Sequence, residues 1–240
     1  MKAAWIAAFV LSLSFLPASA GPGCREVPPE PMSASQHGFA FVNSFEWTPP
    51  GGWARLPFRH RYGLCGGMSL LAMDHFHAGI EPQSVSVTPG PGDPLFERIL
   101  LRQADSMGFL GRRTLRYLAW MALPEEGEGG SQAATRREFY SMKADLERGE
   151  PVALALIYVG FAERGMIWHN HQVVATGVQY LGRGTFAVSL YDPNFPGNGS
   201  VSLVLRGSPD GYETTQWIGP HRRLHVRGFF RTPYLPSEVK

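Results

Sequence analysis

The arrangement of apolar residues changes near residue 150, and this change limits the folds that the chain can adopt. Before it, apolar residues recur at helical spacing; after it, they form continuous or alternating runs that are rich in β-branched side chains. Helices followed by a series of strands predict an α+β fold rather than alternating strand–helix units. We therefore expect a helical N-terminal half packed on a C-terminal antiparallel β-sheet.

Four helices are expected in the first half. The one at 65–78 has an apolar stripe and is followed by Gly79, a typical helix stop. The second begins after Asp93 with a proline at its first position and ends at Gly108. A third covers 114–122. Thr135 and Glu138 form the pattern of a capping box, which predicts a fourth helix from Thr135 to Gly149.

Five strands are expected in the second half. Two of them are joined through the glycine-containing turn at 181–184, which predicts a β-hairpin. The expected strand ranges are 151–159, 171–180, 185–191, 201–205 and 224–230.

The N-terminus has the features of a secretory signal peptide over residues 1–20. Lys2 precedes an apolar stretch, and small residues at 18 and 20 favour cleavage after Ala20. We expect an exported protein, periplasmic or secreted, with no membrane span in the mature chain. Residues 21–57, rich in proline and glycine, are expected to form an irregular leader arm, and 58–240 a single domain.

The charge balance excludes several classes of partner. The chain has 22 basic and 20 acidic residues without a basic run, so no nucleic-acid partner is expected. No cofactor motif is present. The residues of Asp74 to His77 do not have the spacing of a metal site, so no metal is expected. The sequence gives no indication of an oligomeric state.

Three residues are candidates for chemistry: Cys65, His171 and Asp192. Cys65 is at the expected start of a helix, where unpaired amide groups and the helix dipole lower the pKa of a thiol. Gly66 and Gly67 leave room beside the sulfur for a substrate carbonyl and for backbone N–H donors. This environment is typical of a nucleophile.

His171 and Asp192 are 21 residues apart, at the start and the end of the expected hairpin, which places them side by side. On the side that carries Val173 and Ala175, His171 is expected to point at the helix that bears Cys65. Asp192 can then hold the imidazole tautomer. His169 is a rival base, Asn194 is an alternative orienting residue, and the Asp-Pro-Asn at 192–194 also suits a simple turn.

The ordered set of cysteine, distant histidine and aspartate resembles that of papain-like cysteine peptidases. The residues His-Gln-Val-Val-Ala-Thr-Gly at 171–177, with Asp-Pro after the next strand, are most similar to the bacterial bacteriocin-processing (peptidase C39-like) type. The resemblance covers about residues 58–206. It implies a papain-like fold, a Cys65–His171 pair oriented by Asp192, and a peptide or small amide or ester substrate.

The sequence departs from this family at one functional position. Papain-like enzymes usually supply an oxyanion-hole glutamine about six residues before the cysteine, and here position 59 is arginine. Arg59 can donate to an oxyanion or serve as a surface charge. The substitution therefore leaves the source of the oxyanion hole open.

Four hypotheses remain. The first is an exported thiol-dependent hydrolase, a peptidase or amidase, with a Cys-His-Asp triad and a thioester intermediate. The second is an inactive papain-like binding or structural module with a Cys24–Cys65 disulfide, the default pairing for two cysteines in an exported chain. The third is an acyltransferase or transglutaminase-like enzyme with the same triad. The fourth is an enzyme whose cleft the leader containing Cys24 covers.

Overall fold

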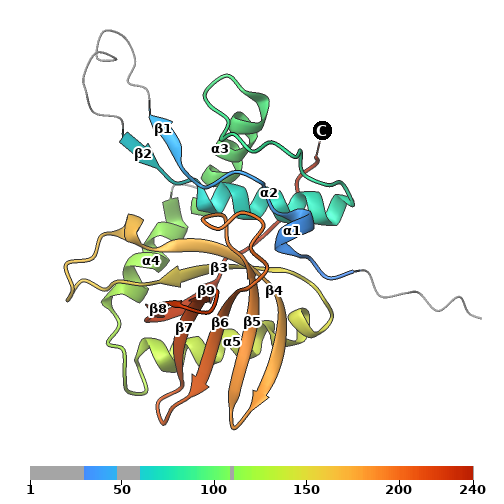
Figure 1. Cartoon of the computed structure of the whole chain (residues 1–240). Coiled ribbons are helices and arrows are strands. Elements are labelled where there is room, and N and C mark those ends of the chain that lie inside the picture. Colours follow the sequence, from blue (N-terminus) through green and yellow to red (C-terminus); the bar gives the residue numbers. More distant parts are fainter. Residues whose placement is uncertain (1–29, 48–59, 109–110, 240) are drawn as a thin grey trace, which may run out of the picture.

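The computed structural model describes residues 30–47, 60–108 and 111–239, which form a mixed helix and sheet fold of the α+β class (Figure 1). Within these ranges, no helix is both long and apolar enough to cross a bilayer. The helices are α1 Ala34–His37, α2 Cys65–Ala78, α3 Pro94–Met107, α4 Arg112–Ala122 and α5 Ser131–Glu147, with a short 3-10 helix at Ile167–His169.

The strands of the second half form one antiparallel sheet of seven strands in the order β8-β7-β6-β5-β4-β3-β9. A separate antiparallel pair joins β1 to β2. The strands are β1 Phe45–Trp47, β2 His60–Tyr62, β3 Val152–Ile157, β4 His171–Gly182, β5 Thr185–Tyr191, β6 Val201–Gly207, β7 Tyr212–Ile218, β8 Arg222–Val226 and β9 Gly228–Arg231.

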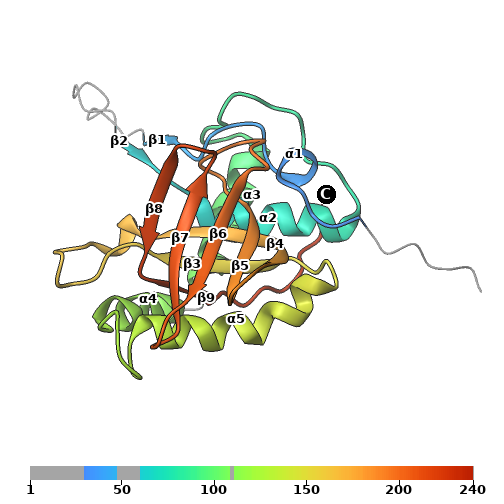
Figure 2. The same cartoon turned by 60° about the horizontal axis from the view of Figure 1, so that its bottom comes forward.

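The sheet is strongly curled, and its connectivity explains why. β8 and β9 occupy opposite edges of the sheet although Arg227 alone separates them in sequence. A single residue cannot span a flat sheet of this width, so the two edges must approach each other, as Figure 2 shows. At the corner, the N–H of Arg227 donates to the carbonyl of Ile157 at 2.8 Å, and the hydroxyl of Ser131 donates to the carbonyl of Arg227.

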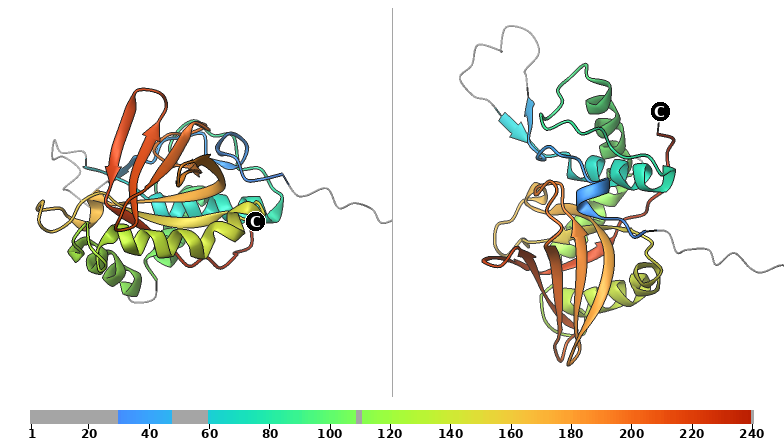
Figure 3. Two further views of the ribbon diagram at one scale, coloured as in Figure 1. Left: turned by 90° about the horizontal axis from the view of Figure 1, so that it is seen from below. Right: turned by 45° about the vertical axis from the view of Figure 1, so that its right-hand side comes forward.

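Helices cover both faces of the sheet, and alternate residues of β3 pack with different helices. Val152, Leu154 and Leu156 pack in one apolar cluster with α5, whereas Ala153 packs with α2, and Ala155 and Ile157 pack with α4. Every residue of β3 is therefore buried. This explains why the strand is continuously apolar rather than alternating. Figure 3 shows α5 crossing one face of the sheet.

The described part of the expected leader arm belongs to the core. Phe39, Phe41 and Phe45 are each about 1% exposed and pack against the apolar residues of α2. The phenol of Tyr191 accepts a hydrogen bond from the N–H of Phe39, which ties this segment to β5. Residues 30–47 thus contribute a helix, a strand and buried aromatic rings to the fold.

Several element boundaries differ from the sequence prediction. The capping box at Thr135 and Glu138 is wrong, because α5 already begins at Ser131. Its first amides donate to the carbonyls of Pro124 and Glu125 instead. The hydroxyl of Thr135 accepts from Phe229, and Glu138 accepts from Arg231. The strand expected at 224–230 is two strands, β8 and β9, and β7 was not predicted.

Candidate active site

Cys65 is the first residue of α2, so its side chain lies beside the unpaired amides of the first helical turn. The preceding residue, Leu64, provides no side-chain cap. Side chains from elsewhere take its place: the N–H of Leu64 donates to Asn43 at 2.6 Å, and that of Gly67 donates to Gln103 at 2.9 Å. The backbone N–H groups of Gly66 and Gln172 point at the thiol.

The two glycines after the cysteine are required by close packing. A Cβ at Gly66 would lie 2.2 Å from the hydroxyl of Ser106 and 2.5 Å from Oε1 of Gln172. A Cβ at Gly67 would lie 2.1 Å from the carbonyl oxygen of Ile99 on α3. The glycines therefore allow α3 and the start of β4 to approach the first turn of α2, which places further side chains around the thiol.

Gly67→Ala is expected to destabilise the protein by about 2–3 kcal/mol, because the new methyl group overlaps the backbone of α3. In a helix with free space around the glycine, the same change would stabilise the protein by about 1 kcal/mol. The sign of the change in the free energy of unfolding therefore shows whether α3 packs against Gly67. Thermal unfolding should show a midpoint lower by about 4–12 °C. Gly90→Ala, where a Cβ would have no neighbour within 4 Å, is the control and should leave the midpoint unchanged. An unchanged or higher midpoint for Gly67→Ala would contradict this packing.

His171 opens β4, opposite Leu156 of β3. It shares a side of the sheet with Val173 and Ala175, as expected, but that side packs with α5 and not with α2. The expectation that this side of the sheet faces α2 is therefore wrong. Contact with Cys65 arises because the N-terminus of α2 reaches the beginning of β4, where the hydroxyl of Ser69 donates to the carbonyl of Gln172. The His171 side chain is hydrogen-bonded to the Cys65 thiol.

Asp192 follows β5 and lies beside His171. Its Oδ1 is 2.7 Å from Nε2 of His171 and also accepts from the N–H of Asn194 at 2.9 Å. Because Nε2 faces the carboxylate, Nδ1 is the ring nitrogen left to face the thiol. Asp192 is 1% exposed, so its charge is balanced by these donors and not by water.

Two residues that the sequence analysis did not single out hold Asp192 in turn. Nε2 of Gln216, on β7, donates to Oδ2 of Asp192 at 2.7 Å. The hydroxyl of Tyr158 donates to Oε1 of Gln216 at 2.5 Å. Burial raises the pKa of Tyr158, with the nearby charges of Asp192 and Cys65 acting in the same direction, so this phenol keeps its proton and remains a donor. The chain of hydrogen bonds fixes the carboxylate plane.

The electrostatics of the cluster favour a thiolate–imidazolium pair. Burial alone would raise the pKa of the Cys65 thiol, but the hydrogen bond and charge of His171 and the N–H groups of Gln172 and Gly66 lower it. Burial also disfavours the imidazolium, but the charge of Asp192 and its hydrogen bond, together with Cys65, raise the pKa of His171 to about 10. Both shifts favour a negative sulfur beside a positive ring.

The thiol opens onto a cavity of about 600 Å³. Cys65 is half-buried and lines this space together with His171, whereas Asp192 is 1% exposed and does not line it. Polar and aromatic side chains from several regions of the chain form the walls, among them Asn43, Tyr62, Gln103, Tyr117, Tyr158 and Trp168. Trp168 is the most exposed of these, at 70%. The volume is sufficient for one or two residues of a peptide or a small amide.

The remaining candidate residues lie apart from this cluster or outside the described residues. The side chain of Asn194 accepts from Asn43, and only its backbone N–H reaches Asp192. His169 precedes the strand, is exposed, and its ring accepts from the N–H of Met166. Cys65 is a free cysteine among the described residues. Arg59 and Cys24 lie outside the described ranges.

Comparison with known proteins gives no relative. No protein-family model, no curated protein and no solved structure matches this chain.

Proposed function

We propose that the protein is an exported, papain-like thiol hydrolase that cleaves amide or ester bonds through a thioester on Cys65. The observation that carries the proposal is the buried imidazole of His171, which is hydrogen-bonded to Cys65 and lies 2.7 Å from Asp192 beside an open cavity. A nucleophile, a base and an orienting carboxylate in this relation are the parts that acyl transfer requires.

In the acylation step, the Cys65 thiolate attacks the substrate carbonyl carbon. A C–S bond forms, and the π electron pair of the carbonyl moves onto its oxygen. When this oxyanion collapses, the bond to the amine or alcohol breaks, and Nδ1–H of His171 gives its proton to the leaving group. Asp192 keeps the ring in the required tautomer and stabilises its charged form throughout.

In the deacylation step, the now neutral His171 takes a proton from a water molecule that attacks the thioester carbon. Collapse of the second oxyanion breaks the C–S bond and releases the carboxylic acid. Cys65 leaves as a thiolate and His171 is again an imidazolium, so the ion pair favoured by the local pKa values is restored. If an amine attacked instead of water, the same residues would perform acyl transfer.

The arrangement supports the active hypothesis over the inactive module. A structural cysteine has no need of a base that is itself oriented by a buried carboxylate, a glutamine and a tyrosine. Perturbed pKa values that cluster at a cavity are typical of functional sites. A disulfide to Cys24 would consume the thiol that this arrangement serves.

The test is the pH dependence of Cys65 alkylation by iodoacetamide, followed by intact mass and by digestion to separate Cys65 from Cys24. Because the pKa of Cys65 is lowered, the midpoint of its labelling should lie at a lower pH than that of an ordinary thiol, and its labelling at pH 6 should be faster. A thiol with an ordinary pKa near 8.5 would label about 300-fold more slowly at pH 6 than at its plateau. The same protein unfolded in guanidinium should return to that ordinary profile.

Two results would contradict the proposal. One is an unreduced mass two units below that of the dithiol with no labelling, which would show a closed Cys24–Cys65 bond. The other is a folded protein whose Cys65 labels only above pH 8, which would remove the thiolate–imidazolium pair.

A further inference from the structure

The tetrahedral intermediate of the proposed reaction carries a negative oxygen, and this charge needs positioned N–H donors. The backbone N–H of Cys65 is one donor. It is the first residue of α2, so its amide has no intrahelical acceptor, and it donates no other hydrogen bond in the described part of the chain. Arg59 lies outside that part of the chain. Because an oxyanion hole uses more than one donor, we expect a second donor among the residues that line the cavity.

We propose that Gln103, on α3, supplies this second donor through the amide hydrogens of its Nε2. The inference rests on the proposed function and completes it by assigning an oxyanion-hole residue. Gln103 follows Cys65 in the sequence by 38 residues and belongs to a different helix, so no spacing rule around the cysteine points to it.

The orientation of the Gln103 amide is fixed by its partner. The N–H of Gly67 lies 2.9 Å from Oε1 of Gln103. A backbone N–H can only donate, so the atom that faces it must be the oxygen, and the NH₂ group must lie on the other side of the amide. Gln103 and Cys65 line the same cavity. The Nε2 group has no acceptor among the described residues and is not sealed from the cavity.

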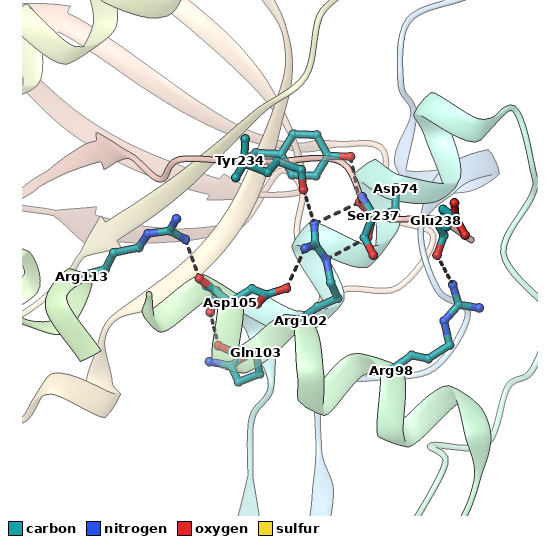
Figure 4. Close-up of polar contacts among 11 residues, drawn as sticks. Asp74, Arg98, Arg102, Gln103, Asp105, Arg113, Tyr234, Ser237 and Glu238 are labelled. Carbon is teal, nitrogen blue, oxygen red and sulfur yellow. Dashed lines mark hydrogen bonds and ion pairs between the residues drawn. The ribbon is translucent and has the colours of Figure 1, made fainter. Parts of the chain in front are cut away.

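Gln103 is also held on a rigid support. The neighbouring residue Arg102 is buried and forms an ion pair with Asp74 of α2 at 2.8 Å, and it donates to the carbonyl of Leu235 at 3.0 Å (Figure 4). The hydroxyl of Ser106 donates to the carbonyl of Gln103 at 2.8 Å. An oxyanion donor is effective when its position does not change during the reaction, and this support satisfies that condition.

Of the four other amide side chains on the cavity wall, Asn43 and Asn170 are less suited to the role. Asn43 uses both ends of its amide, since Oδ1 accepts from Leu64 and Nδ2 donates to Asn194. Asn170 accepts from Tyr158 through Oδ1, and its Nδ2 is shut off from solvent. Tyr117 and Gln172 line the same cavity and remain rival donors.

The experiment compares two reactions of Cys65 in the full-length protein. Acylation by 4-nitrophenyl acetate, followed as a burst of nitrophenolate, passes through an oxyanion, whereas alkylation by iodoacetamide does not. Gln103→Met removes both the donor and the acceptor of the amide. Gln103→Glu keeps an acceptor for the N–H of Gly67 but removes the donor. Gln179→Met, at an exposed position of β4, is the matched control.

Both Gln103 variants should acylate about 10²–10³-fold more slowly than the wild type, the usual effect of losing one oxyanion donor. Their plateau alkylation rates, measured above the thiol pKa, should stay within about twofold, because alkylation develops no oxyanion. Gln179→Met should match the wild type in both reactions.

Four results would overturn the assignment. Recovery of acylation in Gln103→Glu would show that Gln103 only caps α2. A loss in Tyr117→Phe larger than that in Gln103→Met would give the role to Tyr117. If the wild type gave no burst although iodoacetamide labelled Cys65 rapidly, the proposed acyl transfer would fail and this inference with it. A normal burst in the wild type and in both Gln103 variants would leave the proposed function standing and remove Gln103 alone.

Discussion

Cys65→Ala is expected to lower turnover of an amide or ester substrate by about 10⁴–10⁶-fold, because no other group replaces an attacking nucleophile. The fold should survive, since the change removes one sulfur atom at a half-buried position that borders a cavity. The measurement is the single-turnover rate together with the thermal midpoint of the same preparation.

Cys24→Ala is the matched control, because it makes the same substitution at the other cysteine of the chain. It should keep the activity of the wild type. Activity that persisted in Cys65→Ala, or that disappeared equally in both variants, would contradict Cys65 as the nucleophile.

His171→Gln is expected to lower turnover by about 10⁴-fold or more, because it removes the base and the acid of the proposed reaction together. It also removes the hydrogen bond and the positive charge that lower the pKa of Cys65 against burial. The pKa of the thiol should therefore rise, and the midpoint of iodoacetamide labelling should move to higher pH. At pH 6 the variant should label far more slowly than the wild type.

His221→Gln, at an exposed turn between β7 and β8, is the matched control for His171→Gln and should leave both measurements unchanged. His169→Gln tests the rival base. If His169→Gln rather than His171→Gln moved the labelling midpoint, the assignment of His171 would be wrong. The double variant Cys65→Ala, His171→Gln should be no less active than Cys65→Ala alone, because the two residues act as a unit.

Local signals predicted the helical half and the hairpin well. α2 spans the expected residues because Gly79 adopts a left-handed conformation with φ of 65°, which ends the helix where the sequence indicated. The start of α5 was not predictable in this way. Its first amides are satisfied by the carbonyls of Pro124 and Glu125, and carbonyl acceptors have no signature in the sequence.

The residues of the candidate site likewise fall into those that local sequence signals predicted and those that long-range packing placed. His171 and Asp192 lie on adjacent strands joined by a short turn, so their spacing alone indicated that they would meet. Gln216 and Gln103 reach the site from β7 and α3, and their positions depend on how the sheet curls and how closely α3 packs on α2. β7 escaped prediction because two of its buried residues, Thr214 and Gln216, are polar, so neither an apolar run nor an apolar alternation marks it.

The curl of the sheet also determines when, during synthesis of the chain, the candidate site can be completed. β3 is paired on one side by β9, whose residues come more than 70 positions later, so a nascent chain must hold this edge open until nearly all of it has been made. The proposed nucleophile, Cys65, is made early, on α2, but its proposed base lies on β4 and the support for Asp192 arrives with β7. On the proposed function, the complete Cys65–His171–Asp192 site forms only after β7 has been added, so a nascent chain cannot catalyse acyl transfer before that point.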